Sequence, residues 1–323
     1  MTKALIVTAN GGSDVLQVRD VDVPPPGPGQ AQIKVAATGV NFIDVYQRQG
    51  VYPIPTPFTL GMEGAGEVVA VGDGVDLRPG DRVAWAMSLG SAAGLSNQPA
   101  PQLVPVPDGV PLTTAAAAML QGMTAHYLVN STYAVQPGDI ALVHAAAGGV
   151  GQLLVQLITA KGGRVIATAG SAEKLAIAEG LGADVLINYR DTDDLADAVR
   201  AATGGRGVDV AYDGVGKDTF DASLASLRPR GMLVLFGGAS GQVPPVDLQR
   251  LNAGGSLFVT RPTLAHYVLD REELLWRGGE ILGALADGSL HLEIGGEWPL
   301  AEAATAYDTL ESRASTGKLL LLP

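Results

Sequence analysis

Residues 139–260 repeat one pattern, in which short apolar segments alternate with segments that carry apolar residues at helical spacing. Gly182, Gly204 and Pro229 mark the ends of three helical segments. Strands and helices that alternate through short connections form a parallel sheet covered by helices on both faces, so we predict a doubly wound α/β domain. The expected strands are 140–144, 164–168, 185–188, 208–213, 232–236 and 256–260, and the expected helices are 150–160, 172–181, 193–202 and 218–227.

The first of these strands runs into a glycine-rich turn that opens a helix. Gly148 and Gly149 allow backbone amides to approach phosphate oxygens, and Gly151 allows the helix to pack closely. Ala146 stands where the usual G-x-G-x-x-G pattern has its first glycine, so the motif by itself is also compatible with a tight turn that binds nothing. Its place at the start of the strand and helix repeat favours the pyrophosphate of a dinucleotide in a Rossmann domain.

The end of the second strand indicates which dinucleotide binds. NAD-preferring sites carry an acidic residue about 20 residues after the glycines, where it accepts hydrogen bonds from the ribose. Here the sequence is Thr-Ala-Gly-Ser over residues 168–171, with no acid before Glu173. A 2'-phosphate favours hydroxyl and cationic donors, which Ser171, Lys174 and Tyr189 can supply. We therefore expect NADPH, although Lys174 and Tyr189 taken singly could also be ordinary surface side chains.

Composition narrows the class of protein. Of the 323 residues 47% are hydrophobic, which is enough for a large core. The net charge of -12 would repel nucleic acid and anionic membranes, so neither is expected as a partner. An acidic protein that binds an anionic cofactor needs local positive charge, which draws attention to Lys174, Arg190 and Arg313. The absence of cysteine excludes disulfide and thiolate chemistry. With no signal-peptide pattern or membrane-length apolar run, a cytoplasmic enzyme is expected.

The first 120 or so residues have a different pattern. Alternating residues near 32–35, with 67–71 and 82–85, indicate half-exposed strands, and turns rich in proline and glycine separate them. Residues 115–129 are expected to form a helical bridge, and the tail is expected to contain helices near 271–286 and 301–312 before it returns to the first domain. We therefore predict a mostly β domain at 1–123, a cofactor domain at 124–263 and a return segment at 264–323, with the active site in the cleft between the domains.

Seven segments of the chain match a known family. They are 39–44 with Tyr46 and Tyr52, 61–66, 80–83, 144–151, 187–190, 259–262 and 311–314. Together they resemble the medium-chain dehydrogenase/reductase superfamily, in its zinc-free quinone oxidoreductase branch, to which zeta-crystallin belongs. The resemblance implies a chaperonin-10-like catalytic domain, an NADPH-binding domain, transfer of reducing equivalents from NADPH to a quinone, and a homodimer.

Metal binding is not expected. Zinc-dependent members of the superfamily bind catalytic zinc through a cysteine where this chain has Asn41, and through a histidine where it has Met62. An amide and a thioether are poor zinc ligands, and a four-cysteine structural site is impossible without cysteine. The four histidines are scattered at spacings unlike a metal signature.

Without zinc, the protein must hold the nicotinamide C4 about 3 to 3.5 Å from the acceptor, exclude water and offer donors to the oxygen that gains charge. A quinone is a suitable acceptor because its reduction yields a delocalised aromatic anion. Asn41, Tyr46 and Tyr52 match family positions near nicotinamide and substrate and are our catalytic candidates. The tyrosines could instead only pack their loop, and Asn41 could only stabilise a turn. Asp44 is expected to be a structural partner.

The resemblance also implies cofactor contacts across the chain. Arg313 matches a position that reaches the adenosine phosphate in relatives, and Asn41 is shared with the catalytic candidates. The expected cofactor-binding residues are Asn41, Thr124, Tyr127, Gly148, Gly149, Val150, Gly170, Ser171, Lys174, Tyr189, Gly214, Phe236, Gly237 and Arg313.

The expected dimer rests on the apolar strand at 256–260, because an unpaired apolar edge invites aggregation unless another chain covers it. Two other functions remain open. An NADPH-dependent alkenal, enone or enoyl-thioester reductase would use the same zinc-free fold, and a catalytically weak NADPH-binding protein is a further possibility.

Overall fold

The computed structural model describes residues 1–312 and 315–323, and the chain divides into two compact units. Unit 1 comprises Met1–Met123 and Tyr267–Pro323, and unit 2 comprises Thr124–His266. The division therefore falls at 266/267, three residues after the end of the predicted cofactor domain. No helix among the described residues is both long enough and apolar enough to cross a membrane.

Unit 2 is built on a six-stranded parallel sheet in the order β11-β10-β9-β12-β13-β14, which confirms the predicted doubly wound fold. In chain order these strands are the third, second, first, fourth, fifth and sixth, the Rossmann order. The strands are β9 (Ile140–Val143), β10 (Arg164–Ala169), β11 (Val185–Asn188), β12 (Val208–Asp213), β13 (Leu227–Leu235) and β14 (Phe258–Thr260).

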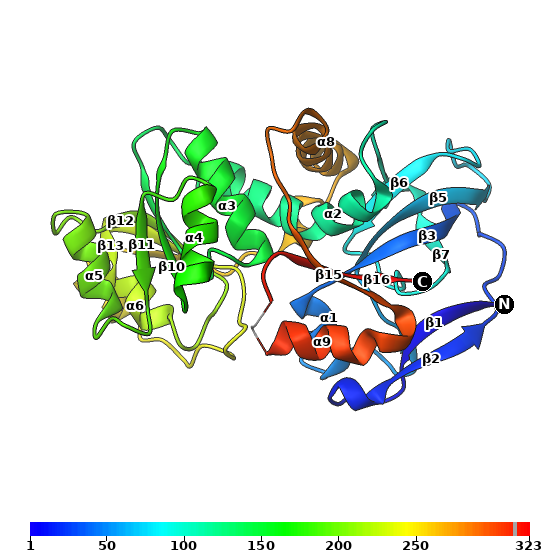
Figure 1. Cartoon of the computed structure of the whole chain (residues 1–323), viewed down its shortest axis with the longest axis horizontal. Coiled ribbons are helices and arrows are strands. Elements are labelled where there is room, and N and C mark those ends of the chain that lie inside the picture. Colours follow the sequence, from blue (N-terminus) through cyan, green and yellow to red (C-terminus); the bar gives the residue numbers. More distant parts are fainter. Residues whose placement is uncertain (313–314) are drawn as a thin grey trace. The chain divides into compact units, whose positions relative to one another are not determined.

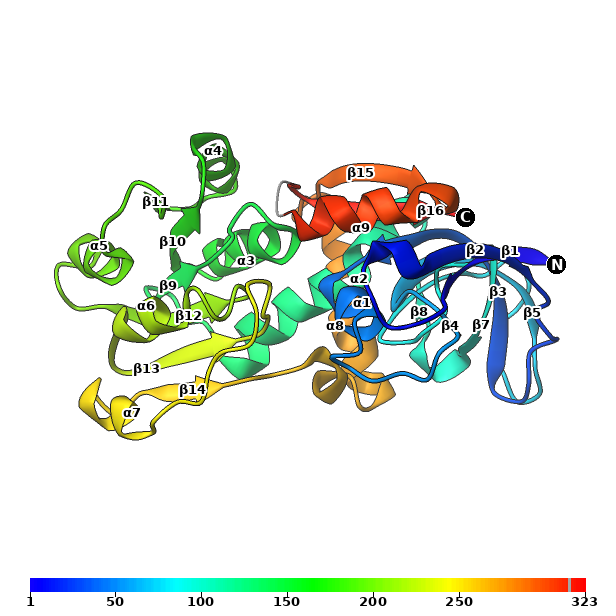
Figure 2. The same cartoon turned by 90° about the horizontal axis from the view of Figure 1, so that it is seen from below.

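Helices cover both faces of this sheet. Figure 2 shows α3 and α4 on one side and α5 and α6 on the other. All six residues of β12 are buried, as expected for a central strand packed on both faces. The helices are α3 (Gly149–Ala160), α4 (Ala172–Gly180), α5 (Leu195–Ala202) and α6 (Phe220–Ala225), with the short α7 (Gln249–Ala253) before β14.

One boundary in unit 2 differs from the sequence prediction. The fourth helix was expected to continue to residue 227 and to end at Arg228 and Pro229, but β13 already begins at Leu227 and includes both residues. Leu227 pairs with Val208 at the start of β12, and the register then shifts before Met232. Helical spacing of apolar residues therefore overestimated α6, because tertiary pairing with β12 decides where the chain becomes extended.

Unit 1 is mostly β. A seven-stranded sheet has the order β15-β16-β3-β5-β6-β8, with β7 also paired to β3, and a second sheet has the order β2-β1-β4. The strands are β1 (Thr2–Val7), β2 (Leu16–Val21), β3 (Gln30–Val40), β4 (Phe58–Thr59), β5 (Glu63–Val71), β6 (Arg82–Ala86), β7 (Leu95–Pro99), β8 (Val104–Pro105), β15 (Ile294–Pro299) and β16 (Lys318–Leu322).

The end of the chain completes this unit. Leu319, Leu320 and Leu321 of β16 pair antiparallel with Val40, Gly39 and Thr38 of β3. Helix α9 (Ala303–Glu311) lies beside β15 and β16 (Figure 1), and its buried Tyr307 joins the apolar core with Val45 of α1 (Phe42–Arg48). The other helices of this part of the chain are α2 (Leu112–Tyr127), whose last residues belong to unit 2, and α8 (Arg271–Asp287).

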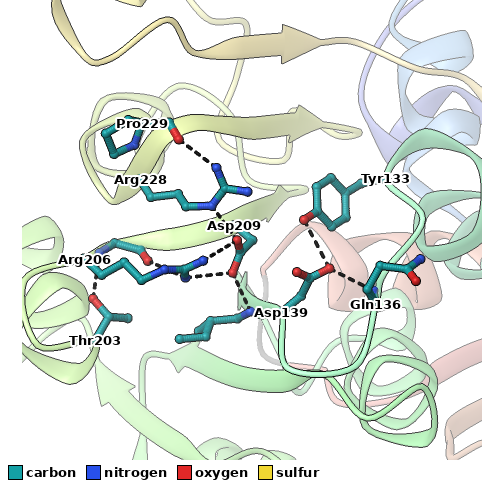
Figure 3. A network of polar contacts seen from close by, with 10 residues as sticks. Tyr133, Gln136, Asp139, Thr203, Arg206, Asp209, Arg228 and Pro229 are labelled. Carbon is teal, nitrogen blue, oxygen red and sulfur yellow. Dashed lines mark hydrogen bonds and ion pairs between the residues drawn. The ribbon is translucent and has the colours of Figure 1, made fainter.

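A charged cluster ties the amino ends of strands in unit 2 (Figure 3). Asp209 of β12 is 1% exposed and accepts hydrogen bonds from Arg206, Arg228 and the backbone amide of Ile140. Burial by itself would raise the pKa of this carboxyl, but these donors outweigh it and lower the pKa to about 2. The cluster therefore joins β9, β12 and β13 at the edge opposite to the glycine-rich turn.

We expect Asp209→Asn to destabilise unit 2 by about 2 kcal/mol at pH 7, since the lowered pKa represents stabilisation of the folded state. Because the folded-state pKa lies below the unfolded value, this contribution is present above about pH 4 and is lost as the pH falls toward 2. Urea unfolding at pH 7 and pH 3 measures it. Asp221→Asn, in an exposed pair with Arg250, is the matched control and should change stability by less than about 1 kcal/mol. An equal effect of the two substitutions would contradict the prediction.

Candidate functional site

The carboxyl ends of the parallel strands in unit 2 gather most of the predicted cofactor residues. Because neighbouring parallel strands end at the same edge of a sheet, the turns that follow them lie close together. Gly148, Gly149 and Val150 follow β9, Gly170 and Ser171 follow β10, Tyr189 follows β11, Gly214 follows β12, and Phe236 and Gly237 follow β13. The parallel registers of β9 with β10 and β12 hold the first of these turns at the centre of this edge.

The glycine-rich turn has the tight geometry that a phosphate site requires. Gly148 precedes the first residue of α3, and its backbone amide bonds to the carbonyl of Ala145. A Cβ atom on Gly151 would lie 2.3 Å from that carbonyl oxygen and 2.8 Å from the Cα of Ala146, so the helix can pack here only with glycine. Ala145 has a φ of 48°, a left-handed conformation that non-glycine residues seldom adopt. Backbone strain of this kind often accompanies a ligand-binding turn.

The residues predicted to read the adenosine side lie at the ends of β10 and β11. Ser171 caps α4, and its Oγ accepts a hydrogen bond from the backbone amide of Lys174 at 3.3 Å. A Cβ atom on Gly170 would lie 2.5 Å from the Tyr189 hydroxyl and 3.1 Å from Nε of Arg190, so both side chains lie beside this glycine. Tyr189 is 47% exposed. Arg190 was noted from the charge balance but was not among the predicted cofactor residues.

Thr124 and Tyr127, also predicted as cofactor contacts, lie on α2 and are buried, with exposures of 8% and 1%. Arg313 lies outside the residues that the structure describes. Gly214 and Phe236 are in contact, since a Cβ atom on Gly214 would lie 2.9 Å from the Phe236 ring. The turns after β12 and β13 therefore support each other at the edge where the nicotinamide end of a dinucleotide was expected.

A buried polar network lies beneath these turns and was not predicted from the sequence. Both oxygens of Asp213 accept from the Thr219 hydroxyl, Oδ1 also accepts from the amides of Val215 and Gly216, and Oδ2 accepts from the Ser223 hydroxyl. Ser223 thereby commits its only proton to Asp213, so Nε2 of His144, 2.9 Å from Ser223 Oγ, must be the donor in that bond.

This assignment fixes the protonation of His144. With its proton on Nε2, Nδ1 accepts a hydrogen bond from the Thr168 hydroxyl at 2.9 Å. Burial lowers the pKa of His144, although the neighbouring Asp213 acts in the opposite direction, so the imidazole is neutral. The network joins the ends of β9, β10 and β12 to α6, and it fixes the turn that begins at Gly214.

In unit 1, the acceptor candidates lie around α1. Tyr46 and Tyr52 form an edge-to-face pair with ring centroids 5.6 Å apart, and the Tyr46 ring also lies 6.3 Å from Phe42. The backbone amide of Tyr52 bonds to the carbonyl of Tyr46. Tyr52 is 41% exposed and Tyr46 is half-buried, so the pair presents an aromatic surface with polar hydroxyls.

Asn41 is 4% exposed and is held by neighbours on all its polar atoms. Its Nδ2 donates to Oε2 of Glu63 at 2.8 Å and to the carbonyl of Gly39 at 3.2 Å, which uses both amide protons. Its Oδ1 accepts from Nζ of Lys318 at 2.6 Å. The amide of this catalytic candidate is therefore engaged within the protein, and its partners Glu63 and Lys318 were not predicted from the sequence.

Asp44 occupies the third position of α1 and has the structural role expected for it. Its Oδ2 accepts from the backbone amide of Asn41 at 2.9 Å and from the Tyr307 hydroxyl at 3.1 Å. Burial raises its pKa to about 7, although these two donors and Lys318 act to lower it. Among the described residues, no group of three or more histidine, cysteine, aspartate or glutamate side chains could hold a metal ion; the absence of zinc stays a prediction.

Comparisons with known proteins agree across the whole chain. Residues 27–137 match the alcohol dehydrogenase GroES-like domain family, and residues 149–270 match the family described as zinc-binding dehydrogenase. A quinone oxidoreductase of Pseudomonas aeruginosa is 44% identical over 100% of both chains. The chain belongs to the quinone oxidoreductase family of the medium-chain dehydrogenase/reductase superfamily. This confirms the resemblance inferred from the sequence.

Two further relatives of this family bear on function. The crystal structure of Escherichia coli quinone oxidoreductase complexed with NADPH has a TM-score of 0.96 and 40% identity, and the match covers 99% of this chain and 100% of that one. A 2-haloacrylate reductase of a Burkholderia species is 41% identical over 100% of this chain and 99% of its own length.

We predict that the contribution of Asp44 to the stability of the folded protein changes with pH in the opposite direction to that of Asp209. Because its folded-state pKa of about 7 lies above the unfolded value, Asp44 contributes stability at low pH that is lost as the pH rises from about 4 to 7. The unfolding free energy of the wild type, relative to Asp44→Asn, should fall by about 1.4 kcal/mol per pH unit between pH 5 and 6.5 and become constant above about pH 8. Chemical unfolding across this range measures the difference, and a constant difference from pH 5 to 8 would contradict the raised pKa.

Proposed function

We propose that this protein is an NADPH-dependent quinone oxidoreductase that works without zinc. The observation that carries the proposal is the glycine-rich turn between β9 and α3, together with the strand-end residues that surround it. Because residue 151 has no Cβ atom, α3 packs closely against the turn after β9, and the N-terminus of this helix favours the negative charge of a pyrophosphate. The relative from Escherichia coli, complexed with NADPH, supports this assignment.

The proposed 2'-phosphate site lies at the ends of β10 and β11. Tyr189 offers a hydroxyl group, and Lys174 and Arg190 offer positive charge in a protein whose net charge is -12. The Ser171 hydroxyl hydrogen-bonds to the Glu173 carboxylate here, so it would turn from that carboxylate to donate to the phosphate. No carboxylate occupies residues 168–171, where an acid would repel the phosphate. Gly170 supports the assignment, because any side chain there would displace Tyr189 and Arg190.

When bound, NADPH would supply a hydride, and solvent would supply the proton that completes reduction of a quinone to a hydroquinone. The chain's own part is to orient the acceptor and to exclude water. The paired rings of Tyr46 and Tyr52 suit a planar aromatic acceptor, and their hydroxyls can donate to an oxygen that gains charge. Asn41 helps by fixing the start of α1 rather than through a free amide proton, since both of its protons have partners.

An acceptor screen tests the reaction. With NADPH we expect turnover of 1,4-benzoquinone and 9,10-phenanthrenequinone. The rates should be unchanged after the protein has been dialysed against a chelator, and elemental analysis of the dialysed protein measures any zinc that remains. A 2-haloacrylate and an α,β-unsaturated ketone are included because one 41% identical relative is a 2-haloacrylate reductase. Efficient reduction of these alkenes together with inactivity toward both quinones would replace the proposed substrate class. A stoichiometric amount of zinc in the protein, together with loss of activity when that zinc is removed, would contradict the metal-free reaction.

Coenzyme selectivity has its own test. Lys174→Ala should raise the KM for NADPH about tenfold and leave that for NADH within about twofold, because only NADPH carries the 2'-phosphate. Lys161→Ala is the matched control, because Lys161 follows the carboxyl end of α3, whereas the glycine-rich turn lies at the amino end of that helix. Steady-state kinetics with both coenzymes decide the matter, and equal effects of Lys174→Ala on both would remove Lys174 from the phosphate site.

We also propose a homodimer formed through β14. This strand ends the six-stranded sheet, and its Phe258 and Val259 are 55% and 38% exposed. An exposed apolar sheet edge is stabilised when a second copy pairs with it. Light scattering at micromolar concentration should report a dimer for the wild type and a shift toward monomer for Phe258→Asp. Leu269→Asp, at a 78% exposed apolar residue of unit 1, is the control and should remain dimeric; a monomeric wild type would refute the proposal.

A further inference from the structure

An ion pair lies buried in unit 1 next to Asn41. Nζ of Lys318 lies 2.6 Å from Oε2 of Glu63 and 2.6 Å from Oδ1 of Asn41. Lys318 and Glu63 are 1% and 0% exposed. The two charges come from β16 and β5, which are 255 residues apart in the chain, so the pair forms only when the end of the chain adds β16 to the sheet.

The surrounding backbone is shaped to this pair. A Cβ atom on Gly39 would lie 2.0 Å from Oε2 of Glu63 and 2.9 Å from Cε of Lys318, so residue 39 must be glycine while the pair is present. The other carboxylate oxygen, Oε1, accepts from the backbone amide of Leu120 in α2 at 2.5 Å. Each oxygen of Glu63 and each polar atom of the Asn41 side chain thus has a partner.

Stability alone does not account for such a pair. Removing two charges from water is costly, and apolar residues of similar volume usually stabilise a core at least as well. A fully satisfied polar network does, however, fix the orientation of its members. In this network the oriented side chain is that of Asn41, the residue that precedes α1. Helix α1 carries Tyr46 about one turn after its start.

We propose that Lys318 is a positioning residue for hydride transfer. With Glu63, its ammonium holds the Asn41 amide and the start of α1 in place, at the position where zinc-dependent members of the superfamily have a metal-binding cysteine. An internal cation and its hydrogen bonds thereby replace metal ligation as the device that orders this part of the chain. Lys318 acts through Asn41 and α1, and the inference rests on the proposed oxidoreductase function.

The decisive variant removes both charges and keeps the volume. Lys318→Met combined with Glu63→Gln should fold with a melting temperature close to that of the wild type, whereas Lys318→Met alone should melt lower because it leaves a buried carboxylate unpaired. The double variant should nevertheless lose about tenfold to a hundredfold in kcat, since small displacements of orienting groups have effects of that size. NADPH affinity, followed by coenzyme fluorescence, should remain within about twofold. Lys3→Met with Asp20→Asn, an exposed pair in the same unit, is the control.

Because the chain has no cysteine, a chemical rescue is also available. Lys318→Cys introduces the only thiol. Alkylation with 2-bromoethylamine in urea followed by refolding restores an ammonium at nearly the length of lysine, whereas iodoacetamide adds a neutral group of similar size. We expect the kcat of the aminoethylated product to be at least tenfold higher than that of unmodified Lys318→Cys, and the kcat of the iodoacetamide product to be no higher. Wild-type protein carried through the same refolding is the control.

Full kcat in the double variant, or equal recovery with both reagents, would overturn the proposal, and the rescue decides the matter if the double variant does not fold. A larger primary isotope effect with NADPH deuterated at C4 would support it, because hydride transfer would then limit turnover more strongly. The variants are assayed with whichever acceptor the wild type reduces. Inactivity of the wild type toward quinones therefore refutes the proposed function alone, while unimpaired variants refute the role of Lys318 alone.

Discussion

The parallel pairing of β9 with β10 and β12 is the constraint on which the candidate coenzyme site depends. It places β9 at the middle of the sheet with its neighbours on either side ending at the same edge. Gly148, Gly170 and Gly214 come from segments up to 66 residues apart, and this pairing alone brings them to one edge. The glycine-rich turn then needs only a helix that packs closely, which Gly151 allows.

Three buried carboxylates in the two units, those of Asp213, Asp209 and Glu63, each collect several hydrogen-bond donors inside the protein. Asp213 fixes the turn after β12 by accepting from the backbone amides of Val215 and Gly216, and Ser223 and His144 support it from the other side. Asp209 ties strands together at the opposite edge of the same sheet. Glu63 holds Asn41 with Lys318. The networks of Asp213 and Glu63 orient neighbouring groups, since most of the hydrogen-bond energy of a buried network offsets the loss of hydration.

At the two positions where zinc-dependent members of the superfamily have zinc ligands, this chain has the buried residues Asn41 and Met62. Where zinc-dependent members of the superfamily have a cysteine, Asn41 is bound by a cation and an anion from distant strands. Met62, at the position of the missing histidine, is 8% exposed. An amide and a thioether cannot hold zinc well, but they can be packed and hydrogen-bonded into a fixed loop. The reaction that we propose needs such order because the protein must orient a planar acceptor without a metal.

Much of the molecule could be predicted from its residues. The spacing of apolar residues gave all six strands of the parallel sheet, since strand and helix periods are properties of the local chain. The boundary between α6 and β13 was misplaced, and α7 was missed, because pairing with distant strands overrides local preference there. Glycines at the ends of strands marked the edge of the sheet where we place the coenzyme. At Gly170 and Gly214, however, side chains from neighbouring strand ends, Tyr189 and Phe236, leave no room for a Cβ atom, so the need for glycine there comes from the tertiary structure.

The sequence by itself therefore determined the fold class, the family and the residues of the proposed phosphate site, which are encoded in short contiguous motifs. Only the tertiary structure decided how those residues are held. The partners of Asn41, the protonation of His144 and the raised pKa of Asp44 all come from side chains far apart in the chain. Burial and distant charges set these properties, and neither has a signature in local sequence.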